Sequence, residues 1–205
     1  MAAKSDGRLI QIVDATVAEA ARKAGAWVKC APGCTQCCIG VFAISQLDGA
    51  RLREGLDGLT ASDPARAKAV RERARLAVKR LTAEFPGDAQ TGILDPERAE
   101  EFEVFGNDEP CPALDPETGL CDLYAARPMT CRVFGLPLRT EEGLGVCELC
   151  FEGASTEEIA ACEVRPGWEQ MEEEANAEVE RSSGLHGETI VAWALMVPQA
   201  RRDLP

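Results

Sequence analysis

Four of the ten cysteines of this chain fall within residues 30–38, which read Cys-Ala-Pro-Gly-Cys-Thr-Gln-Cys-Cys. Cys34 and Cys37 are three residues apart, the spacing at which two thiolates of one turn converge on a metal ion. Pro32 and Gly33 predict a tight turn and exclude a continuous helix through this stretch. The sequence therefore predicts an irregular, sulfur-presenting loop rather than a regular element.

The adjacent cysteines Cys37 and Cys38 are harder to place on one ion, because neighbouring side chains diverge in both strands and helices. Either the site is a multinuclear cluster with several metal corners, or one of the two thiols packs beside a ligand without being one. Four thiols in such a short stretch do not comfortably close a tetrahedral site alone. The stretch therefore predicts partner cysteines elsewhere in the chain.

Residues 111–135 supply these partners, because Cys111, Cys121 and Cys131 recur there every ten residues. Turn-forming residues separate the first two, so Cys111 and Cys121 are expected to face each other across a hairpin-like loop. Pro128 suits the first turn of a short helix. Cys131 would then lie near the helix start, where the helix dipole and a neighbouring arginine favour a thiolate.

Together, the two cysteine sets resemble the YkgJ-like cysteine-cluster family, which is described as a putative zinc- or iron-chelating domain. That family is similar to a region of the flagellin lysine N-methylases, for which an iron–sulfur cluster has been proposed. The resemblance covers about residues 30–150 and implies a metal-binding domain, but it implies no reaction. It rests on Cys30, Cys34, Cys37, Cys38, Cys111, Pro112, Leu114, Cys121, Tyr124, Arg127, Pro128, Cys131, Arg132 and Phe134.

The family usually carries one further downstream cysteine, and Cys147 or Cys150 could fill that place. These two also form a Cys-x2-Cys pair, a second metal-binding spacing. Sulfur-only ligation suits zinc and iron–sulfur clusters alike, with a 4Fe–4S cluster favoured among the clusters, and the one histidine, His186, lies far from the motifs. The candidate metal ligands are Cys30, Cys34, Cys37, Cys38, Cys111, Cys121, Cys131, Cys147 and Cys150.

Three side chains near the second cysteine set are expected to support the site rather than to ligate the metal. Tyr124 is expected to pack over it, while Arg127 and Arg132 offset the negative charge of clustered thiolates. Cys162 lies among alanines and is expected to be a small core side chain. The sequence assigns no catalytic residue.

The composition narrows the class of partner and the compartment. The formal net charge of −13 argues against general binding to nucleic acid or to an anionic membrane. The N-terminal segment lacks the apolar core of a secretory signal, so a cytoplasmic location is expected. Cytosolic thiols stay reduced, which favours metal ligation over the alternative of disulfides or buried thiols.

Apolar spacing of three and four predicts a mostly α-helical fold, with a single domain over residues 1–205. The irregular centre is expected where residues 30–38 meet residues 111–131, with residues 155–205 as a C-terminal helical extension. The basic face of the third helix is interpreted as solvated, the alternative being a docking surface for an acidic partner. The predicted helices cover residues 8–28, 46–58, 64–85, a short segment after Asp95, 155–181 with a break at Pro166, and 188–197.

Three functions remain open at this point. The first is a metal-binding protein that holds zinc or an iron–sulfur cluster, with no further role defined. The second is an iron–sulfur redox or methyl-transfer module. The third is a metal or redox sensor that acts through a protein partner.

Overall fold

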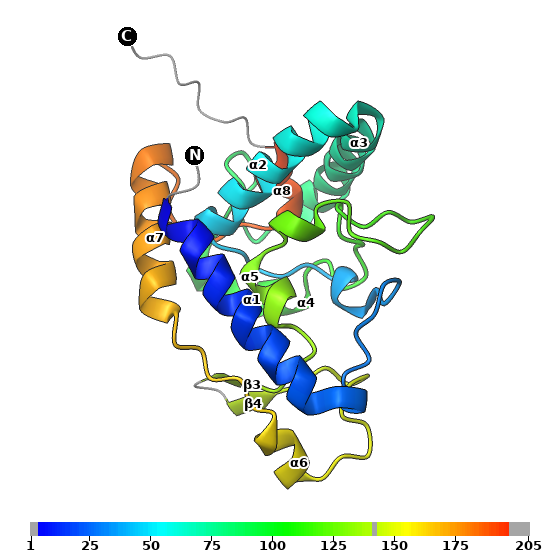
Figure 1. Ribbon diagram of the computed structural model, residues 1–205. Coiled ribbons are helices and arrows are strands. Elements are labelled where there is room, and N and C mark those ends of the chain that lie inside the picture. Colours follow the sequence, from blue (N-terminus) through cyan, green and yellow to red (C-terminus); the bar gives the residue numbers. More distant parts are fainter. Residues whose placement is uncertain (1–3, 141–142, 197–205) are drawn as a thin grey trace.

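The computed structural model describes residues 4–140 and 143–196 and confirms a mostly α-helical single domain (Figure 1). Two small antiparallel sheets accompany the helices, β1–β2 and β3–β4. The α-helices are α1 (Lys4–Ala24), α2 (Gln46–Ser62), α3 (Pro64–Leu81), α4 (Ala99–Val104), α5 (Met129–Val133), α6 (Thr156–Ala161), α7 (Glu169–Ser183) and α8 (Val191–Met196). The strands are β1 (Gly87–Asp88), β2 (Ile93–Leu94), β3 (Leu138–Thr140) and β4 (Gly143–Gly145).

The predicted helix starts are confirmed where a capping residue marks them. Ser45 accepts a hydrogen bond from the backbone N–H of Asp48 at 3.1 Å and begins α2. Asp63 caps α3 in the same way, with proline at the first helical position. Ser155 and Glu158 form a capping box at the start of α6.

The end of α2 differs from the prediction. The predicted helix ends at residue 58, yet the observed helix continues past Gly58 to Ser62. Gly55 lies against Ala126, so closely that a Cβ atom at Gly55 would stand 2.4 Å from the Ala126 Cβ. Because this glycine allows a close approach between two segments, tertiary packing overrides its low helix propensity.

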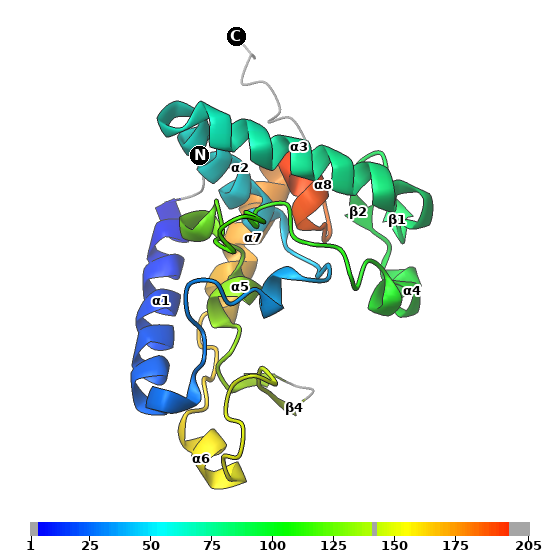
Figure 2. The same ribbon diagram turned by 90° about the vertical axis from the view of Figure 1, so that its right-hand side faces the viewer.

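The core is built by packing helices of both chain halves against each other. α8 packs against α2 and α3, and α7 packs against α1 and α2 (Figures 1 and 2). Leu9 and Val13 of α1, Leu52 of α2 and Val70 of α3 are almost completely buried. The C-terminal helices therefore supply part of the packing on which the cysteine-bearing loops rest.

The basic face of α3 is largely exposed, as interpreted from the sequence, and part of it also forms ion pairs within the chain. Arg66 and Arg73 both form ion pairs with Asp122, whose side chain is 2% exposed. Arg80 donates to the Glu109 carboxylate at 3.1 Å. Part of the basic face therefore pairs with acidic side chains of residues 109–122, the segment that carries Cys111 and Cys121.

No helix within the described residues combines the length and the apolar character needed to cross a membrane.

Candidate metal centre

The first half of the cysteine loop, residues 27–36, is attached to residues 147–151. The Phe151 N–H donates to the Trp27 carbonyl at 2.9 Å, and the two rings stack with centroids 6.5 Å apart. The Lys29 N–H donates to the Cys150 sulfur at 3.4 Å. These contacts bring Cys30 to the Cys-x2-Cys pair of residues 147–150.

The second half of the same loop is attached to a different segment. The Cys111 N–H donates to the Cys38 carbonyl at 2.7 Å, and the Gly40 N–H donates to the Glu109 carbonyl at 3.0 Å. The two halves meet in a short 3-10 helix, Gln36–Cys38. The backbone therefore changes its partner between Cys34 and Cys38.

Cys111 and Cys121 face each other across a hairpin-like loop, as the turn residues predict. Leu114 pairs with Cys121 in an antiparallel bridge, and the Asp115 N–H donates to the Leu120 carbonyl at 2.8 Å. Arg73 donates to the Pro112 carbonyl at 2.8 Å. Together with the ion pairs of Asp122, this contact fixes the hairpin against α3.

Cys131 lies in α5, which follows Pro128 as expected. The start of this helix is held by the buried Asp48 carboxylate, which accepts from the Met129 N–H at 3.0 Å. Arg51 bridges Asp48 to Asp6 of α1, and all three side chains are at most 7% exposed. A buried charge network therefore fixes the position of α5 relative to α1 and α2.

Arg132 of α5 performs a related structural task. It is 4% exposed and donates to the Asp14 carboxylate of α1 at 2.8 Å and to the Ala125 carbonyl at 2.6 Å. Its guanidinium also donates to the Arg127 carbonyl at 3.2 Å. These bonds connect α1 to the backbone between Cys121 and Cys131, so Arg132 orders the segment that presents these thiols.

Five thiols are neighbours in one group, the proximal group: Cys37, Cys38, Cys111, Cys121 and Cys131. A hydrogen bond from the Cys38 thiol lowers the pKa of Cys37 to about 6, with Arg127 as a further favourable charge. Burial raises the pKa of Cys111 to about 11, and the charges of Cys121 and Cys37 add to this increase. Burial also raises the pKa of Cys131, so burial outweighs the helix start and the neighbouring arginine that were expected to favour its thiolate.

Four thiols are neighbours in a second group, the distal group: Cys30, Cys34, Cys147 and Cys150. Burial raises the pKa of Cys30 to about 12, and the charge of Cys150, a hydrogen bond with Cys150 and the charges of Cys34 and Cys147 act in the same direction. Burial likewise raises the pKa of Cys147, which also shares a hydrogen bond with Cys150. A metal ion bound by these sulfurs would stabilise their thiolate form and so offset the cost of deprotonating the buried thiols.

The donor set fits a thiophilic metal centre. All ten cysteines are free. Within residues 4–140 and 143–196, however, no three histidine, cysteine, aspartate or glutamate side chains already stand close enough together to hold a metal ion. The thiols are thus brought into two neighbourhoods by the fold, while their final approach to an ion would accompany binding.

A family model agrees with this chemistry. The model of the CxxCxxCC family, described as a putative zinc- or iron-chelating domain, matches residues 29–151, which is more than half of the chain. The chain belongs to the CxxCxxCC family. No curated protein and no solved structure matches it.

The matched CxxCxxCC region begins and ends at the contact between residues 27–36 and 147–151. Cys162 lies outside this region, is 7% exposed and packs in a hydrophobic cluster with α1 and α7, consistent with a core side chain. His186 also lies outside, with a side chain that is 67% exposed and 3.5 Å from the Glu180 carboxylate.

Two of the side chains expected to support the CxxCxxCC site form a pair on its surface. The Arg127 guanidinium lies 4.1 Å from the centre of the Tyr124 ring, and Tyr124 is 64% exposed. Arg127 is also one of the charges that act on Cys37 and Cys121. Stacking on the ring reduces the freedom of this long side chain, which keeps its charge close to the thiols.

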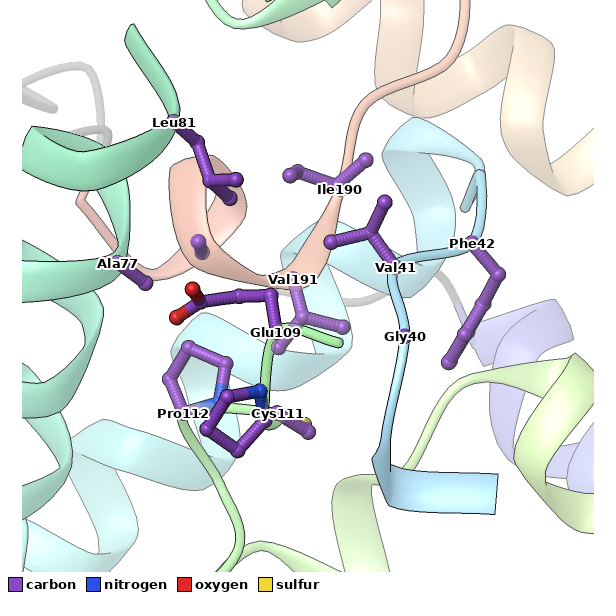
Figure 3. Close-up of a pocket in the computed structure, with 12 residues that line it drawn as sticks. Gly40, Val41, Phe42, Ala77, Leu81, Glu109, Cys111, Pro112, Ile190 and Val191 are labelled. Carbon is purple, nitrogen blue, oxygen red and sulfur yellow. The ribbon is translucent and has the colours of Figure 1, made fainter. Parts of the chain in front are cut away.

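One open pocket borders the proximal group at Cys111 (Figure 3). Its walls are mainly apolar and include Val41, Leu81 and Val191. The Glu109 carboxylate that lines it is paired with Arg80. The pocket adjoins Cys111, and its lining adds no metal ligand to the candidate cysteines.

Proposed function

We propose that this protein holds zinc or an iron–sulfur cluster through its clustered cysteine thiolates. The proposed ligands come from nine cysteines: Cys30, Cys34, Cys37, Cys38, Cys111, Cys121, Cys131, Cys147 and Cys150. The observation that carries the proposal is that four separate segments present free thiols to two shared neighbourhoods. Membership of a family described as a putative zinc- or iron-chelating domain supports it.

Sulfur-only ligands suit two kinds of centre. Zinc takes four thiolates in a tetrahedron, and a 4Fe–4S cluster takes one thiolate at each iron. Four thiolates around a dication leave a net charge of about −2, which a nearby guanidinium offsets. Arg127 is in a position to supply that charge at the proximal group.

The first experiment is an absorption spectrum combined with metal and sulfide analysis of the protein purified without air. Broad visible absorption with matching iron and sulfide would identify a cluster, and a colourless protein with stoichiometric zinc would identify a zinc site. Protein that retains neither metal, even after anaerobic reconstitution, would refute the proposal.

A pair of variants tests the ligand assignment. Cys131→Ser is expected to lower the bound metal sharply, because it removes a proposed ligand. Cys162→Ala is the matched control: it also removes one thiol from a buried position but should leave the metal content at the wild-type level. A large loss of metal in the control would contradict the assignment.

A further inference from the structure

The way the cysteine loop divides between two partner segments points beyond a single metal site. Trp27, Lys29 and Gln36 bond to residues 147–151, whereas residues 38–41 bond to residues 106–111. The Cys34-x2-Cys37 spacing on its own suggests that both thiols share one ion. In the fold, the 3-10 helix Gln36–Cys38, which contains Cys37, marks the point at which the chain passes from one set of contacts to the other.

The distal group has the composition of a complete tetrahedral site. Cys30 and Cys34 come from one turn, in which the Cys34 N–H donates to the Ala31 carbonyl at 2.9 Å. Cys147 and Cys150 come from a second turn, closed by a 2.9 Å bond from the Cys150 N–H to the Cys147 carbonyl. Two short Cys-x2-4-Cys turns from distant segments are the arrangement by which proteins commonly bind zinc.

Backbone features support the sulfurs of this group in two ways. The N–H of Lys29 already donates to the Cys150 sulfur, and such bonds stabilise a thiolate. Gly135, with φ of 98°, leaves the space that these sulfurs use: a Cβ there would stand 2.5 Å from the Cys30 sulfur and 3.8 Å from the Cys150 sulfur. Both the left-handed conformation and the missing side chain are what glycine provides.

The five proximal thiols are neighbours of one another, and their group needs no distal thiol. Cys37 and Cys38 are hydrogen-bonded to each other, and the neighbouring thiols of Cys38 are Cys111 and Cys121. The neighbours of Cys131 are Cys111, Cys37 and Cys121. This group therefore has enough thiols for a centre of its own, and it also has the Arg127 charge that acts on Cys37 and Cys121.

We propose that the chain builds two separate metal centres, and that the distal thiols of Cys30, Cys34, Cys147 and Cys150 hold one tetrahedral dication of the zinc type. This inference rests on the proposed function and extends it. Cys34 and Cys37, three residues apart, then serve different centres. The adjacent pair Cys37 and Cys38 can then be explained without one cluster that takes ligands from both thiol groups.

The test uses full-length protein that has been reduced, freed of metal and titrated with Co²⁺ under nitrogen. Co²⁺ bound by thiolates absorbs in the visible range, so both the number and the type of sites can be read. The wild type should bind two equivalents. Cys147→Ser, which removes a distal thiol, and Cys121→Ser, which removes a proximal one, should each bind one equivalent, with different remaining spectra. Cys162→Ala should bind two, and circular dichroism should show a helical fold for every variant.

The possible results separate the two proposals. Binding of no Co²⁺ and no Zn²⁺ by the wild type would overturn this inference, and failure to assemble an iron–sulfur cluster on anaerobic reconstitution as well would also overturn the proposed function. A single wild-type equivalent that both Cys147→Ser and Cys121→Ser abolish would leave metal binding intact and overturn the two-centre inference. If a variant fails to fold, the wild-type titration decides: two equivalents with two distinguishable affinities support the inference, and one equivalent refutes it.

Discussion

Two glycines of α2 provide a matched pair in which the same substitution should have opposite effects. Both are interior helical positions, where alanine normally stabilises a helix by about 0.5–1 kcal/mol relative to glycine. At Gly58 nothing lies within 4 Å of the added Cβ. Gly58→Ala is therefore expected to stabilise the protein by about 0.5–1 kcal/mol.

At Gly55 the added Cβ would stand 2.4 Å from the Cβ of Ala126, at the start of the segment that leads to α5. Real Cβ contacts are much longer, so the helix or this segment must shift. Overpacking of this kind costs about 1–3 kcal/mol, which exceeds the gain in helix propensity. Gly55→Ala is therefore expected to destabilise the protein by about 0.5–2 kcal/mol net.

The assay is urea unfolding of both variants and the wild type, at one fixed metal loading. For a chain of this size, a change of 1 kcal/mol corresponds to about 2–4 °C in melting temperature, so thermal unfolding provides a second readout. Equal stabilisation by both substitutions would refute the reasoning. It would mean that Gly55 does not mediate the close approach of α2 to the segment that presents Cys131.

Two further predictions concern charged groups. Asp122→Asn should destabilise the protein by about 2 kcal/mol in urea unfolding, because it leaves two arginines facing an amide in a nearly buried position. Glu72→Gln, which breaks an exposed pair on the same helix, should leave stability close to that of the wild type, and equal effects of the two variants would contradict the assignment. Burial raises the pKa of Glu172 from 4.5 to about 7, so its carboxylate is disfavoured in the folded state. Because the folded chain then binds more protons than the unfolded one, stability should fall as pH rises from 4.5 to 7, by about 1 kcal/mol after allowing for partial exposure. Glu172→Gln should remove this part of the slope, and an unchanged slope would contradict it.

Local structure could be predicted from the sequence wherever a side chain bonds to residues close to it in the chain. Ser45, Asp63 and Ser155 begin the helices that their side chains cap. The turn residues between Cys111 and Cys121 produce the hairpin that brings the two thiols together. These features depend on hydrogen bonds over a few residues, which propensity and spacing describe well.

Contacts between residues far apart in the sequence could not be predicted in the same way. Nothing in the spacing of Arg66 and Arg73 indicates that both arginines hold Asp122, since the three residues meet only through folding. The division of the cysteines is a similar case, because Cys34-x2-Cys37 has the spacing of a shared site. The chain before Cys37 contacts residues 147–151 and the chain after it contacts residues 106–111, and these two segments are distant from the loop in sequence.

The contact at the distal group also has a consequence for the order of folding. Lys29 and Cys150 are 121 residues apart, so their contact closes one of the longest loops in the chain. Closing a loop of this length costs chain entropy before any contact repays it, and such contacts tend to form late. Burial of Cys150 and Phe151 in the hydrophobic cluster of α1 and α7, together with the aromatic stack and a few hydrogen bonds, repays that cost. The ends of the CxxCxxCC region are therefore expected to join last, around a molecule whose helical core is already assembled. A metal ion bound by the distal thiols would stabilise this contact between the two ends of the region.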